Sequence, residues 1–250
     1  MANLRTLVNT INASPSTNFP TEFLVYNTSI DSPANGGRCC LWTVPAGTAY
    51  IKFEMWGGGG GGAGSCCCQQ GAPGGSGAYT VKTVCGANLG GCQYTICAGG
   101  TTSTSPNCIG CAGCDSYITG FGLSNFCARG GAYGDTHCFH HFCYSCCITW
   151  SYCCCAYGGD HMHHGQQSTY NVYTWCAAGF QQHAMLASAT ASGPMFGPGG
   201  CIVGGPNGSC TNWFNKSYFP GGGGMSAQTI SGNCFCGGHG GGGLVSVTYG

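Results

Sequence analysis

Six consecutive glycines, Gly57–Gly62, directly follow a segment with the pattern of a β-strand and constrain the fold more than any other feature of the chain. The preceding segment, Thr48–Trp56, alternates apolar residues with larger or polar ones: Ala49, Ile51, Phe53 and Met55 against Tyr50, Lys52, Glu54 and Trp56. A period of two is typical of a strand with one apolar face. Gly77–Val84 predicts a second strand, and the terminal Gly237–Gly250 places a glycine run ahead of a last strand. We therefore expect these three strands to share one sheet.

The glycine runs allow two interpretations. Extended three-fold helices of the polyproline II type would let neighbouring runs hydrogen-bond through their peptide groups, as buried backbone requires. The alternative is a set of flexible glycine linkers. Aromatic residues embedded among the glycines, such as Trp213 and Tyr218, favour the ordered arrangement.

The chain is unusually poor in charge. Six basic and six acidic residues make 5% of its 250 residues and give a formal net charge of zero, whereas about a quarter of the residues in an ordinary soluble domain are charged. A neutral chain lacks the basic face that nucleic acid requires and the charge that attracts a protein to anionic lipid. No apolar run approaches the length of about 18 residues that predicts membrane insertion. Because near-zero net charge favours association, we expect a homo-oligomer or a part of a larger assembly.

Glycine and cysteine both exceed their normal share, with 49 and 24 residues. Ordering a glycine in a regular element costs about 0.5–1 kcal/mol more than ordering an alanine, and a disulfide contributes about 2–4 kcal/mol. Cross-linking by cysteines would thus offset the glycine content, and metal clusters or neighbouring subunits could do the same. Adjacent cysteines such as Cys39 and Cys40 are poorly placed to bridge each other, so each should reach another segment.

The first twenty residues have one basic residue and no apolar core, so we do not expect them to act as a signal peptide. Disulfides normally belong to exported proteins. A virion protein that is released by lysis into an oxidising medium would reconcile these observations, and so would a metal-binding protein of the cytosol.

Cysteine and histidine gather between residues 108 and 164, and thiolate and imidazole ligands at such spacings suit zinc or iron. Structural disulfides and free thiols are the alternatives, because a chain this rich in cysteine contains Cys-x-x-Cys spacings by chance. The candidate metal ligands are Cys108, Cys111, Cys114, His137, His140, His141, Cys143, His161, His163 and His164.

The sequence does not predict an enzyme. Cys138 and His140 form a Cys/His pair, but no acid stands where it would orient the histidine, and a thiol among so many is more often structural. The six acidic residues are scattered and offer no pair of carboxylates for acid–base chemistry.

We divide the chain into an N-terminal arm or strand, residues 1–38, and a glycine- and cysteine-rich β domain, residues 39–250, with a Cys/His-rich insertion at 108–176. The expected fold class is all-β: a small antiparallel sheet or sandwich with long glycine-rich loops or polyglycine helices, cross-linked by cysteines. Further strands are expected at Thr21–Ser29, Cys92–Cys97, Phe142–Tyr152 and Tyr170–Trp175, and a single short helix at Gln181–Ser192.

Several stretches together resemble the glycine-rich domains of bacteriophage tail fibres and other virion structural proteins. They are Trp42–Gly47, the strand Tyr50–Trp56 with its glycine run, Gly77–Tyr79, and the terminal Gly240–Tyr249. The resemblance implies polyglycine layers, a location in the virion and a role in host attachment. Its implied partners are other virion proteins and a receptor or glycan of the host surface. A capsid decoration protein, a metal-binding protein and an extracellular glycine-rich matrix or filament protein are the alternative functions.

Overall fold

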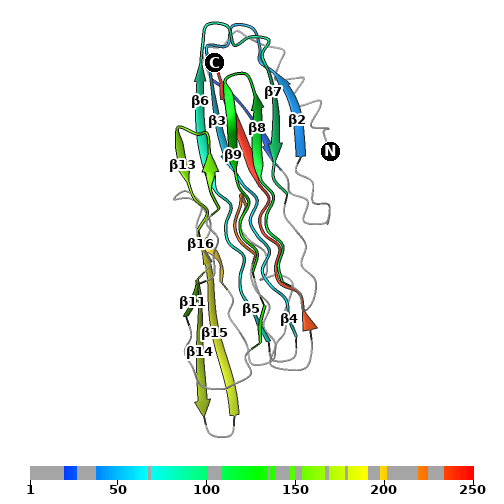
Figure 1. Cartoon of the computed structure of the whole chain (residues 1–250), viewed down its shortest axis with the longest axis vertical. Coiled ribbons are helices and arrows are strands. Elements are labelled where there is room, and N and C mark those ends of the chain that lie inside the picture. The colour runs from blue at the N-terminus through cyan, green and yellow to red at the C-terminus, as the bar shows by residue number, and fades with distance from the viewer. Residues whose placement is uncertain are drawn as a thin grey trace.

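The computed structural model describes residues 20–26, 38–66, 69–100, 109–134, 136–138, 147–149, 154–166, 169–177, 180–190, 198–201, 219–224 and 234–250. Every regular element in these ranges is a β-strand. The expected all-β fold class is therefore confirmed. The molecule is elongated, with two sheets at one end and the glycine-rich segments running from them toward the other end (Figure 1).

The first sheet contains the three strands that the sequence places together. Its order is β1-β18-β3-β6-β13, and all of its pairings are antiparallel. Its strands are β1 (Thr21–Tyr26), β18 (Leu244–Tyr249), β3 (Tyr50–Trp56), β6 (Tyr79–Cys85) and β13 (His161–His163). The expected strand at Thr21–Ser29 thus pairs with the last strand of the chain.

The second sheet is also antiparallel, in the order β12-β9-β8-β7-β2. Its strands are β12 (Ala156–Tyr157), β9 (Leu123–Ala128), β8 (Ser116–Gly120), β7 (Gln93–Ala98) and β2 (Arg38–Thr43). The expected strand at Cys92–Cys97 corresponds to β7. The β8–β9 hairpin has no counterpart among the strands expected from the sequence.

The first and second sheets pack face to face around an aromatic core, and together they form a β-sandwich. The alternation of β3 buries Ile51, Phe53 and Met55 completely, as predicted. From the opposite sheet, the ring of Tyr94 lies 5.1 Å from that of Phe53, and Tyr94 is also fully buried. Burial raises the pKa of the Tyr94 hydroxyl, which donates a hydrogen bond to the carbonyl of Phe121 at 2.9 Å.

A separate four-stranded sheet has the order β11-β14-β15-β16. It contains β11 (Cys147–Thr149), β14 (Thr169–Ala177), β15 (Phe180–Thr190) and β16 (Pro198–Cys201). The helix expected at Gln181–Ser192 is wrong, because most of that range lies in β15. The neighbouring β14 is rich in β-branched and aromatic residues, and pairing with such a strand overrides the helix preference of Gln, Ala, Met and Leu.

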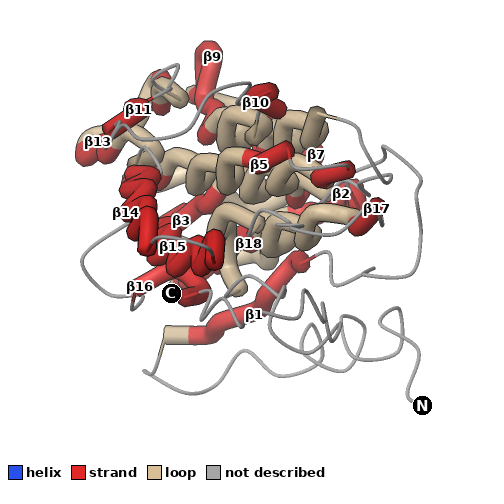
Figure 2. The backbone as a smooth tube through the Cα atoms, turned by 90° about the horizontal axis from the view of Figure 1, so that it is seen from below, coloured by secondary structure: helices blue, strands red, loops and turns tan. Residues whose placement is uncertain are grey.

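Two short antiparallel ladders lie where the glycine-rich segments end, away from the two packed sheets, near the labels β4 and β5 in Figure 1. One pairs β4 (Ser65–Cys66) with β17 (Cys234–Phe235), and the other pairs β5 (Gln69–Gly71) with β10 (Thr136–Cys138). Viewed along the long axis, the connecting segments appear as coils packed side by side in rows (Figure 2).

Candidate functional site

The most distinctive part of the molecule is a bundle of extended glycine segments, which we call the glycine bundle. Residues 57–63 form its central segment and continue β3. The surrounding segments are residues 72–78, 99–100, 110–114, 129–134, 221–224 and 237–243, each joined to a neighbour by backbone hydrogen bonds.

The central segment donates its backbone N–H groups to three neighbours in rotation. Gly58, Gly59 and Gly60 donate in turn to Cys114, Gly241 and Gly75. The same order repeats three residues later, when the N–H groups of Gly61, Gly62 and Ala63 donate to the carbonyls of Cys111, Gly238 and Ala72, all at 2.8–2.9 Å. A repeat of three residues is that of the polyproline II helix. The glycine runs are therefore ordered and hydrogen-bonded, and the alternative of flexible linkers is wrong for the described segments.

The close approach of the neighbours explains why the central segment consists of glycine. A Cβ atom added at Gly57, Gly58, Gly59 or Gly60 would lie between 1.9 and 2.4 Å from a backbone carbonyl oxygen of another segment. Ordinary contacts of a Cβ begin near 3.4 Å. A side chain larger than hydrogen is thus excluded at four successive positions.

Two of the surrounding segments need glycine where they face the centre. In residues 110–114 an added Cβ at Gly110 or Gly113 would lie 2.0 or 2.1 Å from a carbonyl oxygen of the central segment. The residues between them, Cys111 and Ala112, are exposed. Residues 237–243 follow the same rule at Gly237 and Gly240. These two outer segments therefore need a glycine at every third position, whereas an outer segment that also packs on other outer segments needs more, as in the run 221–224.

The bundle is a continuation of the sandwich without its side chains. Trp56 pairs with Leu244 in the first sheet, and the hydrogen bond from Gly59 to Gly241 preserves that register. In the sandwich, side chains separate two sheets by about 10 Å. In the bundle, Gly58 of one layer donates directly to Cys114 of the other. Removing the side chains thus lets the layers bond through their backbones.

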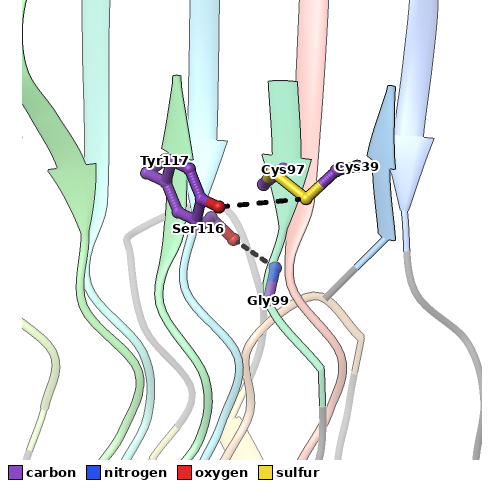
Figure 3. The surroundings of a disulfide bond; sticks show 5 residues. All are labelled: Cys39, Cys97, Gly99, Ser116 and Tyr117. Carbon is purple, nitrogen blue, oxygen red and sulfur yellow. Dashed lines mark hydrogen bonds between the residues drawn. A yellow bond between two sulfur atoms is a disulfide. The ribbon is translucent and has the colours of Figure 1, made fainter. Parts of the chain in front are cut away.

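Ser116 connects the sandwich to the bundle. Its side chain is fully buried, accepts a hydrogen bond from the N–H of Gly99 at 2.8 Å, and donates one to the carbonyl of Trp56 at 2.6 Å. Figure 3 shows the hydrogen bond between Ser116 and Gly99 beside the disulfide between Cys39 and Cys97. The hydroxyl joins both sheets at the level where the glycine segments begin.

The Cys39–Cys97 disulfide links β2 to β7 and confirms that cysteines cross-link this fold. Cys39 thus reaches another segment, as the sequence predicts for a cysteine of an adjacent pair. Among the described residues, Cys40, Cys85, Cys92 and Cys127 carry free thiols. Burial raises the pKa of Cys40. The pKa of Cys127 is raised to about 11 by burial and by the nearby carboxylate of Asp115.

The predicted metal ligands fall into three groups. Cys111 and Cys114 lie in an outer glycine segment, where their spacing equals its three-residue repeat. His137 lies in the β5–β10 ladder, and His161, His163 and His164 are exposed in and beside β13. Cys108, His140, His141 and Cys143 lie outside the described residues. In the part of the chain that the structure describes, no three His, Cys, Asp or Glu side chains come together to hold a metal ion. The metal site stays a prediction.

The histidines of β13 border a small polar cluster. The ring of His163 stacks on that of Tyr79 at 6.1 Å, and the Tyr79 hydroxyl donates to Glu54 Oε1 at 2.8 Å. Burial and this hydrogen bond to a carboxylate raise the pKa of Tyr79. Asp160 directly precedes β13, the edge strand of the first sheet. Lys82 of β6 donates a hydrogen bond to Asp160 at 2.6 Å and thereby lowers the pKa of that carboxyl. These contacts fix the edge strand against β6.

Comparison with known protein families and with characterised proteins finds no match for this chain. No helix with the length and hydrophobicity needed to cross a membrane occurs among the described residues.

Sequence reasoning missed the roles of Ser116 and of the outer glycines. A signal for the outer glycines is present in the sequence, since Gly110 and Gly113 repeat with a period of three, as do Gly237, Gly240 and Gly243. Ser116 offers no such signal, because a serine at the start of a strand is common.

Proposed function

We propose that this protein is a structural component of a bacteriophage virion, a part of a tail fibre or tail tip that contacts the host surface. The glycine bundle carries the proposal. It is a stiff rod, because successive peptide groups of its central segment donate in rotation to three neighbouring segments, so the central segment cannot move without breaking hydrogen bonds to all three. A rod of this kind suits a part that holds a binding surface at a distance.

The end of the bundle away from the sandwich, the far end, is the best candidate for that surface. The central segment and residues 129–134 lead to it, and the hydrogen bond from Gly134 to Gly61 fixes their relative positions there. The sequences that follow or precede these segments, 64–71, 135–153 and 225–236, are rich in cysteine, histidine, serine, glutamine and aromatic residues. Aromatic rings and uncharged hydrogen-bonding groups are suited to a glycan or a protein receptor.

The low charge of the chain agrees with a part that assembles with other virion proteins or with copies of itself. Apolar side chains that are at least 40% exposed occur on the sandwich, among them Leu24, Tyr26, Leu41 and Phe121. We propose that the sandwich attaches the protein to the particle and that the bundle points outward. A capsid decoration protein would use the same elements in a different place on the particle.

Electron microscopy with gold-labelled antibodies against the purified chain tests the proposal on intact phage particles. We expect label at the distal end of the tail. Label spread evenly over the capsid would instead assign the protein to the capsid surface, and particles without label would refute a virion location.

The orientation requires a second experiment. Antibodies against a peptide of residues 130–138, which ends in β10 of a far-end ladder, should block adsorption of the phage to its host. Matched antibodies against residues 86–92, a turn at the opposite end of the molecule, should bind the protein without blocking adsorption. Equal blocking by both would contradict attachment through the far end.

A further inference from the structure

Two cysteines from distant parts of the sequence stand directly opposite each other at the far end of the glycine bundle. Cys66 of β4 and Cys234 of β17 are partners in an antiparallel ladder. We propose that Cys66 and Cys234 form a disulfide bond that closes the far end of the bundle.

The placement satisfies the geometry of a disulfide. Directly opposite residues of an antiparallel pair have Cα atoms about 4.5 or 5.5 Å apart, depending on whether they exchange hydrogen bonds. Both values fall within the range of about 4.4–6.8 Å in which a disulfide can form. The same placement already holds a disulfide in this protein, because Cys39 and Cys97 are directly opposite in the β2–β7 ladder (Figure 3).

The register at Cys66 is fixed by a long, unbroken pairing. β3 and β18 pair from Ile51 with Tyr249 to Trp56 with Leu244. The pairing continues through the glycine bundle, where the N–H groups of Gly59 and Gly62 donate to Gly241 and Gly238. It ends at Ser65 with Phe235 and Cys66 with Cys234. The two residue numbers add to the same total in every pair, so neither segment gains or loses a residue along the way.

This register selects Cys66 among its neighbours. Cys67 and Cys68 follow Cys66 in the sequence, and Cys236 follows Cys234, so several pairings are open on sequence grounds alone. A shift of one residue turns a strand's side chain to the other face of the ladder. The backbone pairing therefore assigns Cys66 to Cys234.

Bond formation needs an oxidant, and a small-molecule disulfide such as oxidised glutathione supplies it. The Cys66 thiolate attacks one sulfur of the small disulfide and releases a glutathione thiolate, which leaves a mixed disulfide on Cys66. The Cys234 thiolate then attacks the Cys66 sulfur and releases the second glutathione thiolate. Two cysteine thiols are oxidised, one small disulfide is reduced, and the two thiol protons pass to the released thiolates.

Alkylation of the folded protein followed by peptide mapping without reductant tests the proposal. The protein is first incubated with oxidised glutathione, and the Cys39–Cys97 bond serves as the internal standard. We expect a linked peptide pair in which fragmentation assigns Cys66 to Cys234, with both protected from alkylation. Alkylation of both residues while Cys39 and Cys97 stay protected would overturn the proposal, and so would fragmentation that links either residue to a different cysteine.

Variants give a second, independent readout. Cys66→Ser should expose Cys234 to alkylation, and Cys234→Ser should expose Cys66. Cys85→Ser is the matched control, because Cys85 is an exposed free thiol whose loss should change no other cysteine. If alkylation at Cys234 is the same in Cys66→Ser and in the control, the two cysteines are not partners. The mapping of the unaltered protein decides the question even if a variant fails to fold.

Discussion

Substituting one central glycine tests the packing of the bundle. In Gly59→Ala, the new Cβ would lie 1.9 Å from the carbonyl oxygen of Gly222. Restoring an ordinary contact of 3.4 Å requires the two segments to separate by about 1.5 Å. The same carbonyl accepts the N–H of Gly241 at 2.7 Å, and Gly241 in turn accepts the N–H of Gly59 at 2.7 Å. A displacement of this size disrupts both hydrogen bonds.

The expected loss of stability combines three contributions. Overpacking in a tight interior costs about 1–3 kcal/mol. Each disrupted and buried hydrogen bond costs about 1–3 kcal/mol. The reduced freedom of the unfolded chain returns about 0.4–1 kcal/mol. We therefore expect Gly59→Ala to lower the free energy of unfolding by roughly 2–9 kcal/mol, a fall in melting temperature of roughly 4 °C or more for a chain of this size.

Gly86→Ala is the matched control within the same chain. An added Cβ at Gly86 would meet only the Leu89 side chain, at 3.6 Å, which is an ordinary contact. We expect a change within about 1 kcal/mol, in either direction. Differential scanning calorimetry at one fixed scan rate compares the two variants with the unaltered protein. Equal melting temperatures for the two variants would show that the central segment is not confined by its neighbours' backbones, and the reasoning would fail.

Three further predictions follow from single contacts. Ser116→Ala removes a buried hydroxyl that bonds both sheets, so it should lower the free energy of unfolding by about 1–3 kcal/mol in a calorimetric comparison with Ser124→Ala, an exposed control. Because the pKa of Cys127 is raised to about 11, its alkylation rate should keep rising up to about pH 11, well past the ordinary cysteine pKa of about 8.5. An alkylation rate that levels off near about pH 8.5 would contradict the raised pKa. Asp160 has a lowered pKa, so its ionised form stabilises the fold above the unfolded value, and this stabilisation is lost as the pH falls through the folded pKa. Asp160→Asn should therefore melt below the unaltered protein near neutral pH, and the two curves should converge in acid.

The sequence predicted the parts of this fold that depend on local pattern. The alternation in Tyr50–Trp56 identified β3 and its buried face. The glycine run that follows β3 and the one that precedes β18 correctly predicted that β3, β6 and β18 share one sheet. The pattern failed where a partner strand decides the structure. Gln181–Ser192 contains good helix formers, yet residues 180–188 pair with β14, and no property of the segment alone reveals that partner.

The candidate site shows the same division. Clustered cysteine and histidine predicted a metal site, which stays a prediction because Cys108, His140, His141 and Cys143 lie outside the described residues. For Cys111 and Cys114 the structure shows a feature that spacing alone does not reveal, since their separation equals the three-residue repeat of an outer glycine segment. Cys66 and Cys234 illustrate the opposite case. They are far apart in the sequence, and only the unbroken pairing from β3 to β4 brings them together.

The three-residue repeat also predicts that inserting three glycines into the central segment destabilises the protein less than inserting one. Inserting one glycine between Gly59 and Gly60 would rotate every following donor by one third of a turn, so that each N–H would point at the wrong neighbour. Inserting three glycines restores the rotation, because the donors that follow again face residues 72–78, 110–114 and 237–243 in the same order. Flexible glycine loops would behave differently, since the cost of closing a loop rises slowly and steadily with its length. We therefore expect the single insertion to lower the melting temperature more than the triple insertion, with calorimetry at one scan rate as the measurement. A triple insertion that destabilises as much as or more than the single one would mean that the segments are not held by a three-fold lattice.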